Sequence, residues 1–270
     1  MQSQCPIGVF DSGVGGLTVW QEIRRQLPNE SIVYFGDTAR LPYGDRSPSE
    51  ITAFVRQILR WFETRSIKMA IAACNTSSAL ALENVRQEFP FPILGIILPG
   101  ARAAVRKGRR IGVIATTATI KSEAYLQAIH EIDPHVQVWQ VACPDFVPLI
   151  EANRIDDPYT YKTAENYLQP LLNADIDTLI MGCTHYPHLA HIFREILPPH
   201  VQLVDPAKYL VTAAAQELDM LGQKNNLGHA PNLGFWVSGN PRQFAQLSKR
   251  WLDKEYRVGK VSFSTVKLLS

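Results

Sequence analysis

The stretch "IGVFDSGVGGLTV" (residues 7–19) joins a short apolar run to a polar, glycine-rich turn and then to a helical pattern. The stretch "IGVIATTATIKSEAY" (111–125) follows the same order later in the chain, with a threonine-rich turn in place of the glycine-rich one. Each is followed, at a similar spacing, by a cysteine at the end of an apolar run: Cys74 in "MAIAACNTSSALAL" and Cys183 in "LIMGCTHYPHLAHI". We interpret this as two similar α/β halves that arose by duplication. A chance likeness of two generic α/β segments is the alternative.

Short apolar, β-branched runs alternate with amphipathic helical stretches along most of the chain. Strands are predicted at 7–10, 31–36, 69–73, 93–97, 110–115, 136–141, 178–182 and 201–205. Helices are predicted, among others, at 17–27, 49–65 and 121–132. This β-α-β-α order predicts parallel sheets with helices on both faces, and the apolar character of the strands fits burial on both faces.

The predicted fold is therefore α/β, with two pseudo-symmetric parallel-sheet domains. We expect residues 1–97 plus 208–270 to form the first domain and residues 98–207 the second. The region after Pro206 carries a further helical pattern and a further strand, "LGFWVSG", which we expect to pack on the first half. Ligands of open parallel sheets bind beyond the carboxyl ends of the strands, so the active site is expected in the cleft between the two domains.

The composition narrows the class of protein. The chain has 270 residues, of which 46% are hydrophobic, and a formal net charge of +2, which argues weakly against a nucleic-acid surface. The basic run "RKGRR" (106–110) is interpreted as a solvated loop, with a polyanion site as the alternative. We find neither a signal peptide nor an apolar window long enough for a membrane helix, and the four cysteines form no CxxC pair. We expect a cytoplasmic protein with reduced thiols, without nucleic-acid or membrane partners.

The cysteines at the ends of apolar runs are the strongest candidates for chemistry. Cys74 and Cys183 each stand at a strand-to-helix turn, where backbone amides and the helix dipole stabilise a thiolate. The alternative is that each is a small buried hydrophobic residue. The mirrored settings favour the functional interpretation. Cys5 and Cys143 lack such neighbours and are interpreted as structural.

The glycine-rich turn after the first strand indicates close approach of the backbone to an anion. It lacks the third glycine of a dinucleotide fingerprint, because Thr18 stands there, and no P-loop lysine follows. A small carboxylate is therefore a better ligand than a nucleotide. Asp11 either caps the following helix or assists a thiol.

His185 follows Cys183 by two positions and is a candidate for proton relay. His188 and His191 continue a three-residue spacing, but positions six apart on a helix face different ways, so we expect no metal site. Both are interpreted as surface residues. Glu151, by itself, is interpreted as an exposed helix residue.

Two opposed thiols suggest a reaction that one thiol cannot perform. If they flank one carbon, one thiol removes a proton while the other donates a proton to the opposite face, which inverts a stereocentre. The sequence shows no Schiff-base lysine and no flavin or nicotinamide fingerprint, so we expect no cofactor.

The motifs "FDSGVGGLTV", "GDTARLPYG", "ACNTSSALAL", "GVIATTATIKSEAY" and "MGCTHYPHL" together resemble the glutamate racemases of the cofactor-independent Asp/Glu racemase superfamily. The resemblance extends from Ile7 to about Ala207. It implies two pseudo-symmetric α/β domains and an isomerase that interconverts L- and D-glutamate. It also implies that D-glutamate serves bacterial peptidoglycan synthesis, and thus cell-wall biogenesis and cell shape.

The resemblance also implies roles for individual residues. Cys74 and Cys183 are the two acid/base thiols, acting on D-glutamate and L-glutamate respectively. Asp11 matches the carboxylate beside the first thiol and His185 the imidazole beside the second, while Glu151 matches an acidic residue near that histidine only by its place after "VPL". The implied substrate contacts are Asp11, Ser12, Tyr43, Gly44, Asn75, Thr76, Thr119, Thr184 and His185.

Three alternatives differ from this hypothesis in class or substrate. A racemase for aspartate or another acidic amino acid is the nearest. A decarboxylase on the same scaffold would need a single essential thiol, and a two-lobed amino-acid binding protein would need none. Dimers are common in the family, so we expect a homodimer. Some members carry an N-terminal extension linked to activation by a cell-wall precursor. Because the first strand begins at residue 7, we expect no such regulation here.

Overall fold

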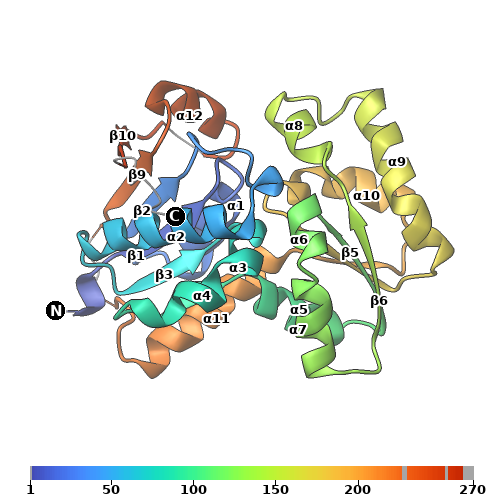
Figure 1. The fold of residues 1–270 in the computed structure, drawn as a ribbon, viewed down its shortest axis with the longest axis horizontal. Coiled ribbons are helices and arrows are strands. Elements are labelled where there is room, and N and C mark those ends of the chain that lie inside the picture. The colour runs from blue at the N-terminus through green and yellow to red at the C-terminus, as the bar shows by residue number, and fades with distance from the viewer. Residues whose placement is uncertain (1, 227–229, 253–254, 264–270) are drawn as a thin grey trace.

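The computed structural model describes residues 2–226, 230–252 and 255–263 and contains two parallel sheets side by side (Figure 1). The strands are β1 (Ile7–Asp11), β2 (Ile32–Gly36), β3 (Met69–Ala72), β4 (Ile93–Gly95), β5 (Arg110–Ala115), β6 (Gln137–Ala142), β7 (Thr178–Gly182), β8 (Gln202–Val204), β9 (Leu233–Val237) and β10 (Val258–Lys260). The first sheet has the order β10-β9-β2-β1-β3-β4 and the second β6-β5-β7-β8, with parallel pairing throughout. The first four strands of each half therefore follow the same spatial order. This supports the interpretation as two related halves.

Helices connect and cover these strands. They are α1 (Leu17–Gln26), α2 (Pro48–Glu63), α3 (Asn75–Leu80), α4 (Leu82–Val85), α5 (Ile97–Val105), α6 (Thr117–Lys121), α7 (Ala124–Ile132), α8 (Phe146–Glu151), α9 (Pro158–Asn173), α10 (Ala190–Ile196), α11 (Pro206–Met220) and α12 (Pro241–Ser248), with 3-10 helices η1 (Gln2–Gln4), η2 (Tyr43–Asp45), η3 (Arg86–Glu88) and η4 (Tyr186–Leu189). Local sequence explains several helix starts. Ser47 and Glu50 form a capping box around Pro48 at the start of α2, and Asp205 caps α11 before Pro206.

Two predicted elements differ from the observed ones. The strand predicted at 93–97 ends at Gly95, because Ile97 already begins α5. The helix predicted at 121–132 is interrupted: α6 ends at Lys121, and α7 begins only after Glu123, which adopts a left-handed conformation with φ of 56°. The other predicted strands agree with the structure to within one or two residues at each end.

Helices contribute to the packing between the two halves. α5 and α11 contact each other at the junction, and α11 also packs on α1 of the first half (Figure 1). The strand predicted in the late segment is β9, which pairs with β2, so this segment packs on the first half as predicted. We propose that the domains run as expected from the sequence, 1–97 plus 208–270 and 98–207.

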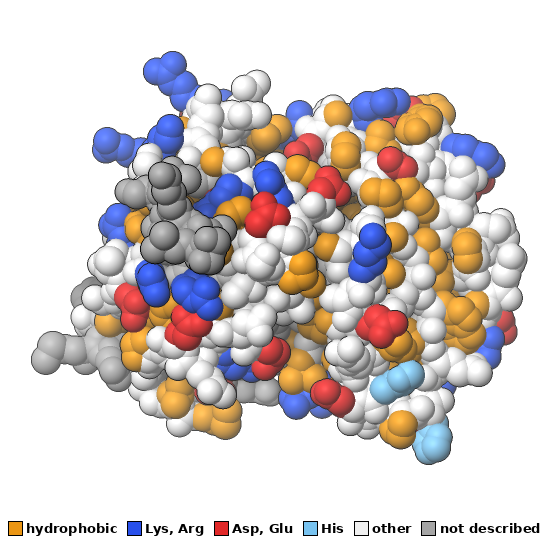
Figure 2. Space-filling model, in the orientation of Figure 1, with side chains coloured by type: hydrophobic (Ala, Val, Ile, Leu, Met, Phe, Trp, Pro, Cys, Tyr) orange, Lys and Arg blue, Asp and Glu red, His pale blue; other side chains and the backbone are white. Residues whose placement is uncertain are grey.

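A buried ion pair fastens the far end of the first sheet. Lys68 Nζ lies 2.5 Å from Glu30 Oε2, with both side chains almost fully buried, and also donates to the carbonyl groups of Ser3 and Gln223 at 2.8 Å. On the face shown in Figure 2, Lys and Arg side chains are interspersed with Asp and Glu side chains. Among the described residues, no helix has the length and apolar character needed to cross a membrane.

Candidate active site

The candidate site lies at the carboxyl ends of the central strands, as predicted for parallel sheets. In the first half, β1 ends at Asp11 and the neighbouring β3 is followed by Cys74. In the second half, β5 is followed by Thr116 and the neighbouring β7 by Cys183. The topology therefore brings one cysteine from each half to the boundary between the halves.

A single cavity of about 150 Å³ contains both cysteines. This volume corresponds to about five water molecules and suits a small organic molecule. Its lining residues are Ser12, Leu41, Pro42, Tyr43, Gly44, Asp45, Cys74, Asn75, Thr76, Thr116, Thr117, Pro144, Val147, Pro148, Cys183, Thr184 and His185. Nine of the twelve site residues predicted from the sequence are in this lining. Asp11, Thr119 and Glu151 are not, and lie behind residues that are.

Cys74 occupies the N-cap position of α3 and is 6% exposed. Its Sγ lies 3.9 Å from Ser12 Oγ. Burial, together with the nearby charge of Asp11, raises the pKa of Cys74 to about 12, although a backbone N–H of Ser77 opposes this effect. The start of α3 thus favours a thiolate, as expected from the sequence, but burial has the larger effect and the pKa of Cys74 is raised. Desolvation outweighs the dipole, and Cys74 holds its proton.

Cys183 has a different neighbour. His185 Nδ1 lies 3.8 Å from Cys183 Sγ, and His185 Nε2 lies 3.2 Å from Glu151 Oε1. Burial of the imidazole acts to lower the pKa of His185, but the contacts with Cys183 and Glu151 outweigh it and raise this pKa to about 10. The structure thus joins three predicted residues, Cys183, His185 and Glu151, in one chain of contacts.

Asp11 connects the two halves from behind the cavity. Its carboxylate accepts a hydrogen bond from Gly13 N–H at 2.9 Å and from the Thr184 hydroxyl at 3.3 Å. Burial raises the pKa of Asp11, against the opposing influence of His185. The halves approach so closely that a Cβ on Gly15 would lie 2.4 Å from both His185 Nδ1 and Thr184 Oγ1. The glycine in the turn is therefore required by packing between the halves.

The polar residues that follow Cys74 are held by hydrogen bonds from the second half. Tyr125 donates to Asn75 Oδ1 at 2.7 Å, while Asn75 Nδ2 is buried and has no partner within the described chain. Thr76 shares hydrogen bonds with Thr116 at 3.0 Å and with Thr119 at 3.3 Å. Thr119 is 1% exposed, so it supports the two threonines that line the cavity.

Tyr43 and Gly44 reach the cavity from the loop after β2. The fully buried Asp37 accepts hydrogen bonds from the Tyr43 hydroxyl and, at 2.7 Å, from Ser238 Oγ, and it pairs with Arg40 at 2.8 Å. Asp37 thus ties this loop to the segment after β9. No role for Asp37 was predicted, although it stands in the motif "GDTARLPYG", because its partner Ser238 is distant in the sequence.

Several residues that line the cavity were not predicted from the sequence. Thr116 and Thr117 fall in the polar segment that ends β5, so their position was available as a signal. Pro144, Val147 and Pro148 line the cavity from around the start of α8, a segment for which no site residue except Glu151 was predicted.

The two remaining histidines of the motif differ from each other. His191 is exposed and lies 3.2 Å from Asp156, as expected for a surface residue. His188 is half-buried in η4 and pairs with Trp251, so its interpretation as a surface residue is wrong. Within the described ranges, no cluster of three or more His, Cys, Asp or Glu side chains is arranged to hold a metal ion.

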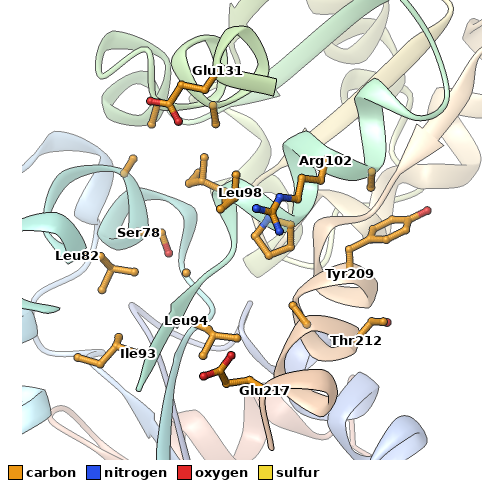
Figure 3. A pocket seen from close by; sticks show the side chains of 18 of the residues that line it. Ser78, Leu82, Ile93, Leu94, Leu98, Arg102, Glu131, Tyr209, Thr212 and Glu217 are labelled. Atoms are coloured by element: carbon orange, nitrogen blue, oxygen red, sulfur yellow. The ribbon is translucent and has the colours of Figure 1, made fainter. Parts of the chain in front are cut away.

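A second hollow, of about 760 Å³, lies at the α5–α11 junction (Figure 3). α5 contributes Leu98 and Arg102 to its lining, and α11 contributes Tyr209, Thr212 and Glu217 (Figure 3). None of its lining residues is a cysteine or histidine. Ser78 of α3 is part of the lining, so the hollow reaches the helix that follows Cys74. Its size therefore does not make it the better candidate for chemistry.

The fold and site define a two-lobed parallel α/β enzyme with a thiol from each lobe on one small cavity. Residues 7–214 match the family described as Asp/Glu/Hydantoin racemase, and the chain belongs to that family. It is thus a racemase, which is an isomerase.

Comparison with individual proteins agrees with this assignment. The chain is 64% identical over 256 residues to a glutamate racemase of Gloeothece citriformis, covering 95% of this chain and 92% of that one. It is 62% identical to a glutamate racemase of Nostoc sp., covering 97% and 90%. Among solved structures, glutamate racemase isoform RacE1 from Bacillus anthracis matches with a TM-score of 0.91, 37% identity and coverage of 97% and 98%. The glutamate racemase of Francisella tularensis in complex with D-glutamate matches with a TM-score of 0.90, 35% identity and the same coverage.

Proposed function

We propose that the protein interconverts L-glutamate and D-glutamate by moving the α-proton between two thiols, without a cofactor. The observation that carries this proposal is the presence of Cys74 and Cys183, one from each lobe, on a single small cavity. The relatives that share most of the chain at 62–64% identity are glutamate racemases, which supports glutamate as the substrate.

The proposed proton transfer from L-glutamate begins at Cys183. The thiolate of Cys183 takes the α-proton, and the electron pair left on the carbon is delocalised into the α-carboxylate. Cys74 then gives its proton to the opposite face of the carbon. The enzyme ends with a protonated Cys183 and a Cys74 thiolate, and D-glutamate reacts by the reverse sequence.

The environments of the two sulfurs support this direction of transfer. A protonated His185 at 3.8 Å favours negative charge on Cys183, whereas the raised pKa of Cys74 suits this thiol to act as the acid. We propose that Glu151 keeps His185 charged and correctly oriented. Asp11 and Thr184 link this arrangement to the first lobe.

The substrate carboxylates need donors that are already in place. We propose that Asn75 Nδ2, the hydroxyl groups of Ser12, Thr76 and Thr184, and backbone N–H groups near Gly44 bind them, while Tyr43 shapes the wall. Thr119 acts through Thr76 and Thr116. Fixed donors of this kind stabilise the negative charge that develops as the α-proton leaves.

The biological role follows from the product. We propose that D-glutamate from this reaction is used in bacterial peptidoglycan synthesis. A cytoplasmic location and a homodimer stay predictions.

The test is an exchange experiment with matched cysteine variants. L-glutamate is incubated in D2O with the protein alone, and optical rotation and α-deuteration are followed. We expect racemisation with deuterium incorporation for the wild type and for Cys143→Ala, a buried cysteine outside the cavity, and loss of racemisation for Cys74→Ala and Cys183→Ala. Full racemisation by either of the last two variants would overturn the two-thiol mechanism, and selective turnover of L-aspartate would overturn the substrate assignment.

A further inference from the structure

The segment that follows α12, residues 249–252, belongs to the first lobe but reaches across to the second. Trp251 and Leu252 are almost completely buried. Gln21 of α1 donates a hydrogen bond to the carbonyl group of Trp251, which anchors the segment on the first lobe. In Figure 1, α12 and α8 lie on facing sides of the boundary between the lobes.

Two contacts run from this segment to the second lobe. Arg250 Nη1 donates to the carbonyl group of Glu151 at 3.1 Å. Trp251 Nε1 donates to Nε2 of His188, and the two rings pack edge to face with centroids 5.2 Å apart and an interplanar angle of 66°. Indole N–H groups that are buried usually have an acceptor, and here the acceptor comes from the other lobe.

Both contacts end on segments that hold His185. Glu151 lies 3.2 Å from His185 Nε2 through its side chain, and Arg250 fixes the backbone of the same residue. His188 donates its backbone N–H to the carbonyl group of His185 at 3.1 Å. A displacement of either segment would therefore change the distance from His185 to Cys183.

We infer that Arg250 and Trp251 form an interlobe clasp that positions His185 beside Cys183, which makes Trp251 a positioning residue for proton transfer at this thiol. The inference rests on the proposed function. The contact requires an unprotonated Nε2 on His188. Burial, together with the charge on His185, lowers the pKa of His188 to about 4, so the acceptor is present at neutral pH.

The clasp predicts an asymmetric effect, because its contacts end on the groups around Cys183. Enantiomers have equal free energies in water, so any variant must change kcat/KM equally in both directions. The isotope effects need not change equally. If the step at Cys183 slows, the primary isotope effect of α-deuterated L-glutamate rises, while that of α-deuterated D-glutamate falls as the step at Cys74 ceases to limit the rate.

The test compares Trp251→Phe, which keeps an aromatic ring but loses the N–H donor, with the wild type. Trp139→Phe is the matched control, since Trp139 lies on β6 and packs on Arg110, away from the cavity. We expect a loss of about fivefold in kcat/KM, as for one hydrogen bond, together with opposite changes in the two primary isotope effects. Arg250→Gln, which removes the second contact, is expected to act in the same sense and serves if Trp251→Phe does not fold.

The outcomes separate the clasp from the proposed function. Wild-type protein that fails to racemise glutamate would refute the proposed function. Normal wild-type racemisation with unchanged kcat/KM in both variants would refute the clasp. A fall in kcat/KM with equal changes in the two isotope effects would also refute it, because it would indicate a general loss of structure.

Discussion

Replacement of Glu151 by Gln removes the negative charge nearest to the outer nitrogen of His185 while keeping the size of the side chain. Two charges 3.2 Å apart interact by about 5 kcal/mol at an effective dielectric constant of about 20, and by about 1.3 kcal/mol in water. The Glu151 side chain is 29% exposed, so the value lies toward the lower limit. We therefore expect the pKa of His185 to fall from about 10 by about 1 to 2 units.

The measurement is an NMR titration of labelled histidine. The chain has seven histidines, and the signal of His185 is assigned by its loss in His185→Gln. Glu165→Gln is the matched control, because Glu165 pairs with Lys162 on the exposed surface of α9 and the loss of this pair should leave His185 unchanged. The reasoning would be refuted if the pKa of His185 were the same in Glu151→Gln and in the wild type.

Glu151→Gln should also change the free energy of unfolding in a way that depends on pH. The fold raises the pKa of His185 from 6.5 to about 10, so it favours the imidazolium. The resulting stabilisation is fully present below pH 6.5 and is lost as the pH rises through about 10. The difference in unfolding free energy between wild type and Glu151→Gln should thus be largest, about 1 to 3 kcal/mol, near pH 6, where carboxylates are ionised and the imidazole is protonated, and should disappear above about pH 10. Denaturant titrations across this range measure it.

Three further variants test the packing around the site. Gly15→Ala places a methyl group 2.4 Å from two side-chain atoms of the other lobe, and we expect a loss of about 1 to 3 kcal/mol in unfolding free energy and a fall in kcat that activity assays would detect. Asp37→Asn leaves Arg40 without its buried partner, and we expect the free energy of unfolding to fall by about 3 kcal/mol. We also expect KM to rise, because Asp37 holds the loop that carries Tyr43, and an unchanged KM would contradict this link. Lys68→Met should lower the free energy of unfolding, measured by chemical denaturation, by about 3 to 5 kcal/mol, because it leaves Glu30 buried without its partner. KM should stay at the wild-type value, because the ion pair lies far from the cavity.

The sequence predicted the strands well because their burial on both faces produces continuous apolar runs. "RIGVIA" and "TLIMG" coincide with β5 and β7, and the polar residues that follow them are the ones that line the cavity. The break between α6 and α7 could not be predicted in this way. Glu123 adopts its left-handed conformation in a region where Tyr125 is fully buried against Asn75, a contact between residues 50 positions apart.

The interlobe contacts were equally inaccessible to pattern analysis. Trp251 and His188 are 63 positions apart, and neither lies in a motif that marks the other. The pattern of histidines predicted a surface position for His188, whereas this residue of η4 is half-buried against Trp251. Local periodicity reports which side of an element is buried, but not which distant element covers it.

The two lobes share a topology, yet their thiols differ in one decisive neighbour. The residue two positions after Cys183 is a histidine, whereas Thr76 occupies that position after Cys74. On the proposed function, Cys183 therefore acts as the base towards L-glutamate and Cys74 as the acid. After one turnover these protonation states are reversed, and the high pKa of Cys74 drives the return of a proton from solvent or from a neighbouring group. A duplicated fold can thus serve a symmetric reaction although its two thiols differ. The interconversion of enantiomers requires that the enzyme can reach both protonation states, one with the proton on Cys74 and one with it on Cys183. It does not require that these two states have equal free energy.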